Sequence, residues 1–306
     1  MKKVLWPLLL VSFLSIAQKA DIGQAEVTRI ETKLASDEMQ GRQIFEPGIE
    51  IASKFIESEF ARIDLKFYGE LKSFRQDFSV KGKSANNVIG ILPGKSKPDE
   101  FVVFSAHYDH LGMETSGSDK IYNGANDDAS GVTAVIALAD YFKKKGGNER
   151  TLIFVAFTGE EIGGFGSRHF SKNIDPDKVV AMFNIEMIGT ESKWGKNSAY
   201  ITGYEKSDFG KILQKNLEGS KFKFEPDPYP EMQLFYRSDN ATLAALGVPA
   251  HTISTSKMDD EKNYHKLSDE VATLDMANMT EIIKSIAISS QSIISGKETP
   301  GRVRKK

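Results

Sequence analysis

The residues best suited to chemistry lie between positions 107 and 265 and supply imidazole nitrogens and carboxylate oxygens. They are His107-Tyr-Asp109, Asp127-Asp128, Gly159-Glu160-Glu161, Glu186 and His265. Both kinds of donor bind zinc at roughly 2.0–2.2 Å, and a single carboxylate can bridge two ions. The chain has no cysteine, which excludes a cysteine-ligated structural zinc site. The set predicts a hydrolase with a two-metal centre.

The first histidine directly follows the apolar run Phe101–Ala106, and Asp109 lies two residues further along. In an extended chain this spacing returns to the same side, so Asp109 can accept a hydrogen bond from the second ring nitrogen of His107. Such a bond fixes the tautomer of a metal-bound histidine and raises its basicity. Taken alone, the pattern is equally typical of a capped histidine in a turn.

Two pairs of adjacent carboxylates strengthen the prediction. Asp127 and Asp128 lie between glycines just before an expected helix, where backbone N–H groups favour negative charge; an ordinary helix cap would give the same pattern. Glu160 and Glu161 follow an apolar strand, where adjacent carboxylates repel each other unless cations offset their charge. One glutamate could bind zinc while the other transfers a proton, although two exposed loop glutamates are the alternative.

Glu186 and His265 complete the set. Glu186 ends the apolar run Val179–Ile185, and His265 lies in the polar loop 263–269. Either residue alone would be unremarkable, since an isolated histidine is more often a surface or hydrogen-bonded residue than a ligand. Together with the preceding residues they give five metal ligands near the ends of expected strands.

The hydrophobic pattern predicts alternating strands and helices. Such alternation is typical of an α/β fold with a mostly parallel, mixed central sheet, helices on both faces, and ligands at the carboxyl ends of the strands. Short β-rich runs predict strands, and apolar residues at helical spacing predict helices. The expected strands are 87–93, 101–106, 151–157, 179–185, 199–201 and 250–253, and the expected helices are 26–34, 49–63, 131–142, 207–217 and 274–293.

The two ends of the chain differ from the rest. Met1-Lys2-Lys3 and the apolar run Val4–Ala17 are typical of a secretory signal peptide cleaved after Ala17, which predicts a secreted or periplasmic protein. An uncleaved membrane anchor is the alternative. Residues 18–296 are expected to form one catalytic domain, and 297–306 a loose tail. A net charge of -2 gives no sign of a nucleic-acid partner. With no cysteine to carry a lipid, we expect no stable membrane association after signal removal, and the sequence does not indicate the oligomeric state.

The order of these motifs resembles the two-zinc aminopeptidase family that also contains glutamate carboxypeptidase, glutaminyl cyclase and transferrin-receptor relatives. The resemblance runs from about Leu34 to Ile293. It rests on the motifs already described and on four further segments: 34–42, Gly166-Ser-Arg-His169, Asn184-Ile-Glu-Met-Ile-Gly189 and Arg237-Ser-Asp239.

This resemblance implies an exopeptidase that hydrolyses the N-terminal bond of peptides with a free N-terminus through a water activated by two zinc ions. Asp127 would bridge the ions, Glu161 and His265 would complete one site, and His107 and Glu186 the other. The remaining implied roles are a general base at Glu160, orientation of His107 by Asp109, a substrate contact at Arg237, and structural roles for Asp128 and His169.

The chain departs from the family pattern at two positions. Glu186 stands where the family usually has aspartate, and its extra methylene shifts the carboxylate by roughly 1.3–1.5 Å, which could weaken the second ion. Asn240 stands where a histidine often follows Ser-Asp, and no role is assigned to it. The same motifs leave two alternatives to the aminopeptidase: a single-zinc glutaminyl cyclase, which forms N-terminal pyroglutamate, and a non-catalytic ectodomain. Because all five ligands and the base are present, the sequence favours the aminopeptidase.

Overall fold

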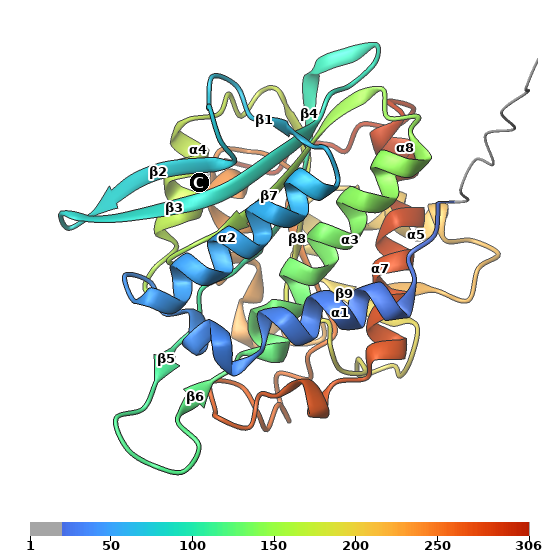
Figure 1. Ribbon diagram of the computed structural model, residues 1–306. Coiled ribbons are helices and arrows are strands. Elements are labelled where there is room, and N and C mark those ends of the chain that lie inside the picture. Colours follow the sequence, from blue (N-terminus) through green and yellow to red (C-terminus); the bar gives the residue numbers. More distant parts are fainter. Residues whose placement is uncertain (1–19, 306) are drawn as a thin grey trace, which may run out of the picture.

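A mixed β-sheet forms the centre of the computed structural model, which describes residues 20–305 (Figure 1). β2 (Arg75–Val80) pairs with β3 outside the main strand order. The main order is β1 (Lys66–Phe67), β3 (Lys83–Leu92), β7 (Arg150–Phe157), β4 (Lys97–His107), β8 (Val179–Ile185), β11 (Ala250–Ser254), β9 (Ser198–Ile201) and β10 (Lys223–Pro226).

The central strands are parallel and the outer ones are mixed. β4 runs parallel to β7 and to β8, and β8 runs parallel to β11. β3 is antiparallel to β7, and β9 is antiparallel to β11. Parallel strands need both faces covered, so they consist of nearly continuous apolar residues; all eight residues of β7 are buried. The arrangement confirms the predicted mixed α/β fold.

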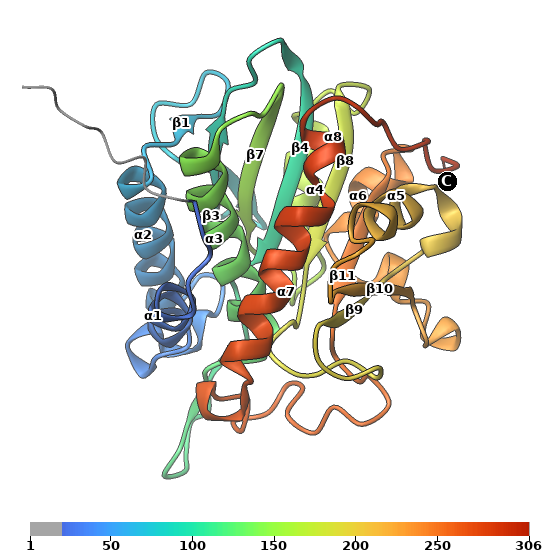
Figure 2. The same cartoon turned by 90° about the vertical axis from the view of Figure 1, so that its right-hand side faces the viewer.

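Helices cover both faces of this sheet (Figure 2). Their buried apolar side chains form one core cluster on each face. One face carries α1 (Gln24–Leu34), α2 (Pro47–Arg62), α3 (Ser130–Lys145), α5 (Phe209–Asn216), α7 (Met276–Ser289) and α8 (Gln291–Ile294), and the other carries α4 (Phe165–Lys172) and α6 (Asn240–Ala245).

All strands and helices expected from the sequence are present, with one helix divided. The expected helix 274–293 is α7 followed by α8, with a break at Ser290. The strands β1, β2 and β10, the helices α4 and α6, and the small hairpin formed by β5 (Gly112–Met113) and β6 (Ile121–Tyr122) were not predicted. They are short or lie at the edge of the sheet, so their hydrophobic pattern is weak.

The segment after residue 296 is not the loose tail that we expected. Val303 is only 4% exposed and lies in the core cluster of the second face. The buried guanidinium of Arg150 donates hydrogen bonds to the carbonyl oxygen of Glu298 and to Oγ1 of Thr299. Arg302 donates to the carbonyl oxygen of Val179. These contacts fix the segment, and composition alone does not reveal them.

The expected signal peptide, residues 1–17, lies outside the described residues. Within residues 20–305, no helix combines the length and the apolar character needed to cross a membrane.

The fixed C-terminal segment leads to a stability prediction. Removing residues 298–306 should lower the free energy of unfolding by about 2–4 kcal/mol, because a valine side chain loses its burial and Arg150 loses two acceptors. Urea denaturation monitored by circular dichroism measures the change. Removal of only 304–306, whose described residues are exposed, is the control. An unchanged midpoint in the longer deletion would show that the segment contributes no stability.

Candidate metal centre

Three neighbouring parallel strands place the predicted site residues at one edge of the sheet. β4 ends at His107, which pairs in register with Phe157 at the end of β7. Glu160 and Glu161 follow three and four residues later, and Glu186 follows the end of β8 directly. Because the carboxyl ends of parallel strands meet, these side chains converge although they are far apart in sequence.

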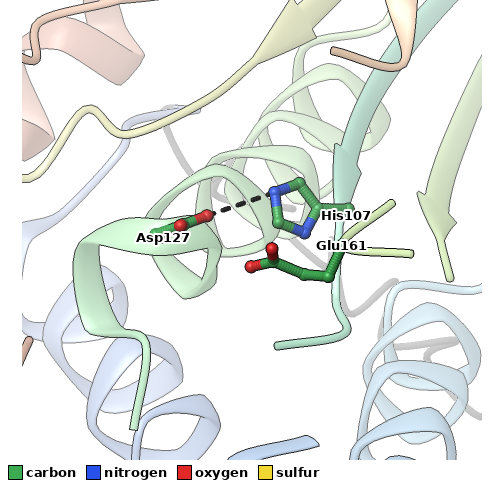
Figure 3. Close-up of side chains that lie close together, drawn as sticks. All are labelled: His107, Asp127 and Glu161. Carbon is green, nitrogen blue, oxygen red and sulfur yellow. Dashed lines mark ion pairs between the residues drawn. The ribbon is translucent and has the colours of Figure 1, made fainter. Parts of the chain in front are cut away.

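Four of the predicted metal ligands lie within contact distance of one another. Nε2 of His107 is 3.3 Å from Oδ1 of Asp127, and Nε2 of His265 is 3.2 Å from Oδ2 of the same carboxylate. Nε2 of His265 is also 3.1 Å from Oε2 of Glu161. Figure 3 shows His107, Asp127 and Glu161 pointing toward one another, and one ligand atom from each lies within 4.8 Å of the others. Asp127 therefore occupies the middle of the cluster.

Asp128, the neighbour of Asp127, does not share this cluster but holds its framework together. Oδ2 of Asp128 accepts a hydrogen bond from the backbone N–H of His107, and Oδ1 accepts from the N–H groups of Gly131 and Met187. One buried carboxylate thus links the end of β4, the start of α3 and the residue after Glu186. This geometry fits the structural role implied by the family resemblance.

Asp269 connects the loop of His265 to Asp127. Its two oxygens accept hydrogen bonds from the backbone N–H groups of Asn126 and Asp127, at 2.8 and 3.0 Å. His265 itself has a φ of 57°, in the left-handed region that is uncommon for residues other than glycine. The surrounding contacts must hold this conformation, which is a frequent feature of functional sites.

The carboxylate of Asp109 contacts the glutamate loop more closely than it contacts His107. Its oxygens accept hydrogen bonds from the backbone N–H groups of Glu160 and Glu161, at 3.2 and 3.3 Å. Nδ1 of His107 lies 3.1 Å from the carbonyl oxygen of Asp109 and 3.9 Å from its Oδ1. The backbone of Asp109 thus orients the imidazole, while its side chain orients the two glutamates.

The acidic groups of the site carry strongly shifted pKa values. Burial raises the pKa of Glu160 to about 10, that of Glu186 to about 7 and that of Asp109 to about 6. Hydrogen bonds to Asp127 and Glu161 raise the pKa of His265 to about 10. A divalent cation would offset this buried negative charge and favour neutral histidines.

The donor set fits a divalent metal. Imidazole nitrogens and carboxylate oxygens are ordinary zinc ligands, and Nδ1 of His107 contacts a carbonyl oxygen as metal-bound histidines usually do. Oε2 of Glu186 is buried without a hydrogen-bond partner among the described residues. A cation would provide that partner.

A pocket opens beside the cluster. Its cavity volume is about 50 Å³, and Glu186, Ser238 and Thr252 form part of its polar wall. The exposed residue Arg237, predicted to contact substrate, lies at this pocket. Its apolar lining comes from Met187, Tyr200, Leu234, Met258 and Tyr264. The site therefore adjoins a small pocket with both polar and apolar walls.

Two residues outside the predicted set gain a structural explanation here. Asn240, to which no role was assigned, is buried and donates hydrogen bonds to the carbonyl oxygens of Phe235 and Ala250, so it holds α6 against β11. His110 was missed: Nδ1 of this buried imidazole lies 2.8 Å from Oε1 of Glu161. Its sequence signal was a second histidine three residues after His107.

Known proteins share this fold. The chain superposes on a zinc aminopeptidase from Bacillus subtilis with a TM-score of 0.73 and 13% identity, covering 90% of this chain and 96% of that one. The structure of the Fimbriiglobus ruber glutaminyl cyclase gives a TM-score of 0.70 and 18% identity, with coverages of 90% and 96%. At these identities the likeness establishes the fold alone.

Comparison with known sequences identifies the protein family. Aminopeptidase YwaD of Bacillus subtilis is 30% identical over 139 residues, which is 42% of this chain and 28% of the relative. The chain thus matches only about a quarter of the length of the curated relatives. The family described as "Peptidase family M28" matches residues 87–288, a span that contains every predicted ligand and more than half of the chain. The chain therefore belongs to peptidase family M28, which confirms the family that its motifs predicted.

Proposed function

We propose that this protein is a zinc-dependent aminopeptidase that hydrolyses the N-terminal bond of peptides with a free N-terminus. The observation that carries the proposal is the close approach of four predicted ligands. His107 and His265 lie 3.3 and 3.2 Å from the two oxygens of Asp127, and His265 lies 3.1 Å from Oε2 of Glu161. Separations of this size suit donors that share cations bound at roughly 2.0–2.2 Å. The aminopeptidases among the family relatives support the same activity.

Two zinc ions per chain are proposed, with Asp127 as the shared ligand. His265, which contacts both Oδ2 of Asp127 and Oε2 of Glu161, would complete one site together with Glu161. His107, which faces Oδ1, would complete the other together with Glu186. The partnerless Oε2 of Glu186 supports this second assignment.

In the proposed reaction, Glu160 is the general base. Bound zinc would supply Lewis acidity, which lowers the pKa of water and polarises the scissile carbonyl. Glu160 would take a proton from the attacking water and pass it to the departing amine. The Asp109 carboxylate holds the backbone of Glu160, which keeps the base beside the ligands rather than in solvent.

The charge of the site favours a substrate with a free amine. Glu186 lines the pocket, and neither Glu186 nor its neighbour in the site, Glu160, is paired with arginine or lysine in any ion pair of the described residues. With metal bound to offset their burial, these carboxylates would be ionised and would attract an N-terminal ammonium group. Arg237 lines the same pocket, and we propose that it contacts the rest of the peptide. We further propose that the enzyme acts outside the cytoplasm, on the basis of the N-terminal sequence alone.

Glutaminyl cyclase is the alternative within the same fold. A cyclase needs a single zinc ion and adds no water to its substrate. The approach of His107 to within 3.3 Å of Asp127 favours the peptidase, because it supplies a second set of ligands for which the cyclase has no use.

A metal-depletion assay tests the activity and separates these alternatives. Chelator-treated protein should lose hydrolysis of aminoacyl chromogenic substrates and regain it when about two equivalents of zinc are added. The same preparations are incubated with a peptide that begins with glutamine, and the products are analysed by mass spectrometry. Release of free glutamine supports the peptidase, whereas loss of ammonia with full recovery at one equivalent of zinc contradicts it.

The role of Glu160 can be tested by Glu160→Gln. This variant keeps the shape of the side chain but cannot accept the proton, so kcat should fall by about 10²–10⁴-fold while both zinc ions stay bound. Activity assays combined with metal analysis by mass spectrometry measure the two effects. Exposed Glu218→Gln is the matched control and should behave like the wild type. Near wild-type turnover in Glu160→Gln would exclude this residue as the base.

A further inference from the structure

His110 is a third imidazole in the metal centre, and the proposed reaction gives it no role. Its side chain is only 1% exposed, although it follows the end of β4 by just three residues. A buried imidazole that only fills space is expected to have apolar neighbours. His110 instead contacts the proposed metal ligands, so its neighbours point to a role in the centre.

The two carboxylate oxygens of Glu161 contact different histidines, and one of these is His110. Nδ1 of His110 lies 2.8 Å from Oε1, while Oε2 lies 3.1 Å from Nε2 of His265. The same Nδ1 is 4.0 Å from Oδ2 of Asp127, beyond hydrogen-bonding distance. Glu161 therefore presents one oxygen to His110 and the other to the metal-ligand cluster.

The hydrogen-bond pattern of the ring defines one contact and leaves one nitrogen free. If Nδ1 carries the proton, its N–H donates to Oε1 of Glu161. Nε2 of His110 is then left with a lone pair and has no hydrogen-bond partner among the described residues. A histidine that binds metal through one nitrogen also donates its other N–H to an acceptor, so metal binding through Nε2 is the competing role. The contact that the structure contains is the one between Nδ1 and Glu161.

The backbone holds the ring of His110 in this orientation. The N–H of His110 donates to the carbonyl oxygen of Arg42, whose own guanidinium donates to the carbonyl oxygen of Gly124. Gly124 has a φ of 55°, and a Cβ there would lie only 2.5 Å from Cδ2 of His110. The ring thus packs directly on a glycine backbone, a position that a larger residue would block.

We propose that His110 is a positioning residue that holds Oε1 of Glu161 through its Nδ1–H, so that Oε2 is directed to the zinc ion shared with His265. The inference rests on the metal centre of the proposed function. A hydrogen-bonded carboxylate ligand loses less rotational freedom when metal binds, and partners of this kind typically contribute a factor of 10–100 in metal affinity.

Three substitutions of His110 test the proposal. Asn places an amide N–H where Nδ1 lies, Gln places it near Nε2, and Ala removes the donor. Zinc affinity is measured by competition with a chromogenic chelator, and visible absorption spectra are recorded with cobalt in place of zinc. The control is the same set of changes at His169, a partly exposed residue whose ring stacks on Phe78. Thermal unfolding of the metal-free variants reports any loss of folding.

In this experiment, His110→Ala and His110→Gln should bind one of the two zinc ions about 10- to 100-fold more weakly, while His110→Asn should stay within about threefold of the wild type with an unchanged cobalt spectrum. Wild-type affinity in the folded Ala variant would overturn the proposal. Equal loss in Asn and Ala, with a changed cobalt spectrum, would overturn it in favour of a direct ligand. A wild-type protein that binds no zinc would instead overturn the proposed function.

Discussion

Burial of negative charge at the ends of three parallel strands is the constraint on which the rest of this structure depends. Glu160, Glu161 and Glu186 follow β7 and β8, and Asp127 lies opposite them in the segment Ala125–Ala129, just before α3. Removing carboxylates from water is unfavourable unless cations or N–H donors compensate. The raised pKa values of Glu160 and Glu186 express this cost directly. Histidine side chains and backbone N–H groups offset part of this cost, and a bound metal would offset the rest.

The carboxylates of the site fall into two groups with different tasks. Asp109, Asp128 and Asp269 accept hydrogen bonds from backbone N–H groups and so connect loops that are distant in sequence. Asp127 and Glu161 instead have oxygens that face histidine nitrogens. The first group fixes the backbone from which the second group projects. Precise ligand geometry therefore depends on residues that never need to touch the metal.

Much of this arrangement could be predicted from the sequence, because the relevant signals are local. Apolar runs such as Val179–Ile185 identify buried strands, and polar residues directly after such runs mark the carboxyl edge of the sheet. The positions of Glu161 and His107 follow from that rule. Contacts that depend on packing could not be predicted. One example is Glu161, whose two carboxylate oxygens contact different histidines. Another is Asp109, whose carbonyl oxygen contacts His107 while its carboxylate binds the glutamate loop. A third is the burial of Val303 in the C-terminal segment.

Glu186 connects the candidate metal centre to the neighbouring pocket. Its backbone N–H donates to the carbonyl oxygen of Ile253, so its position is set by the pairing of β8 with β11. Its side chain lines the pocket that also contains Arg237. A carboxylate that interacts electrostatically with His107 and also forms a wall of the pocket cannot move without affecting both. In the proposed two-zinc centre, the longer glutamate at this position would influence both the second ion and the width of the pocket, so changes in metal affinity and in substrate preference should be coupled.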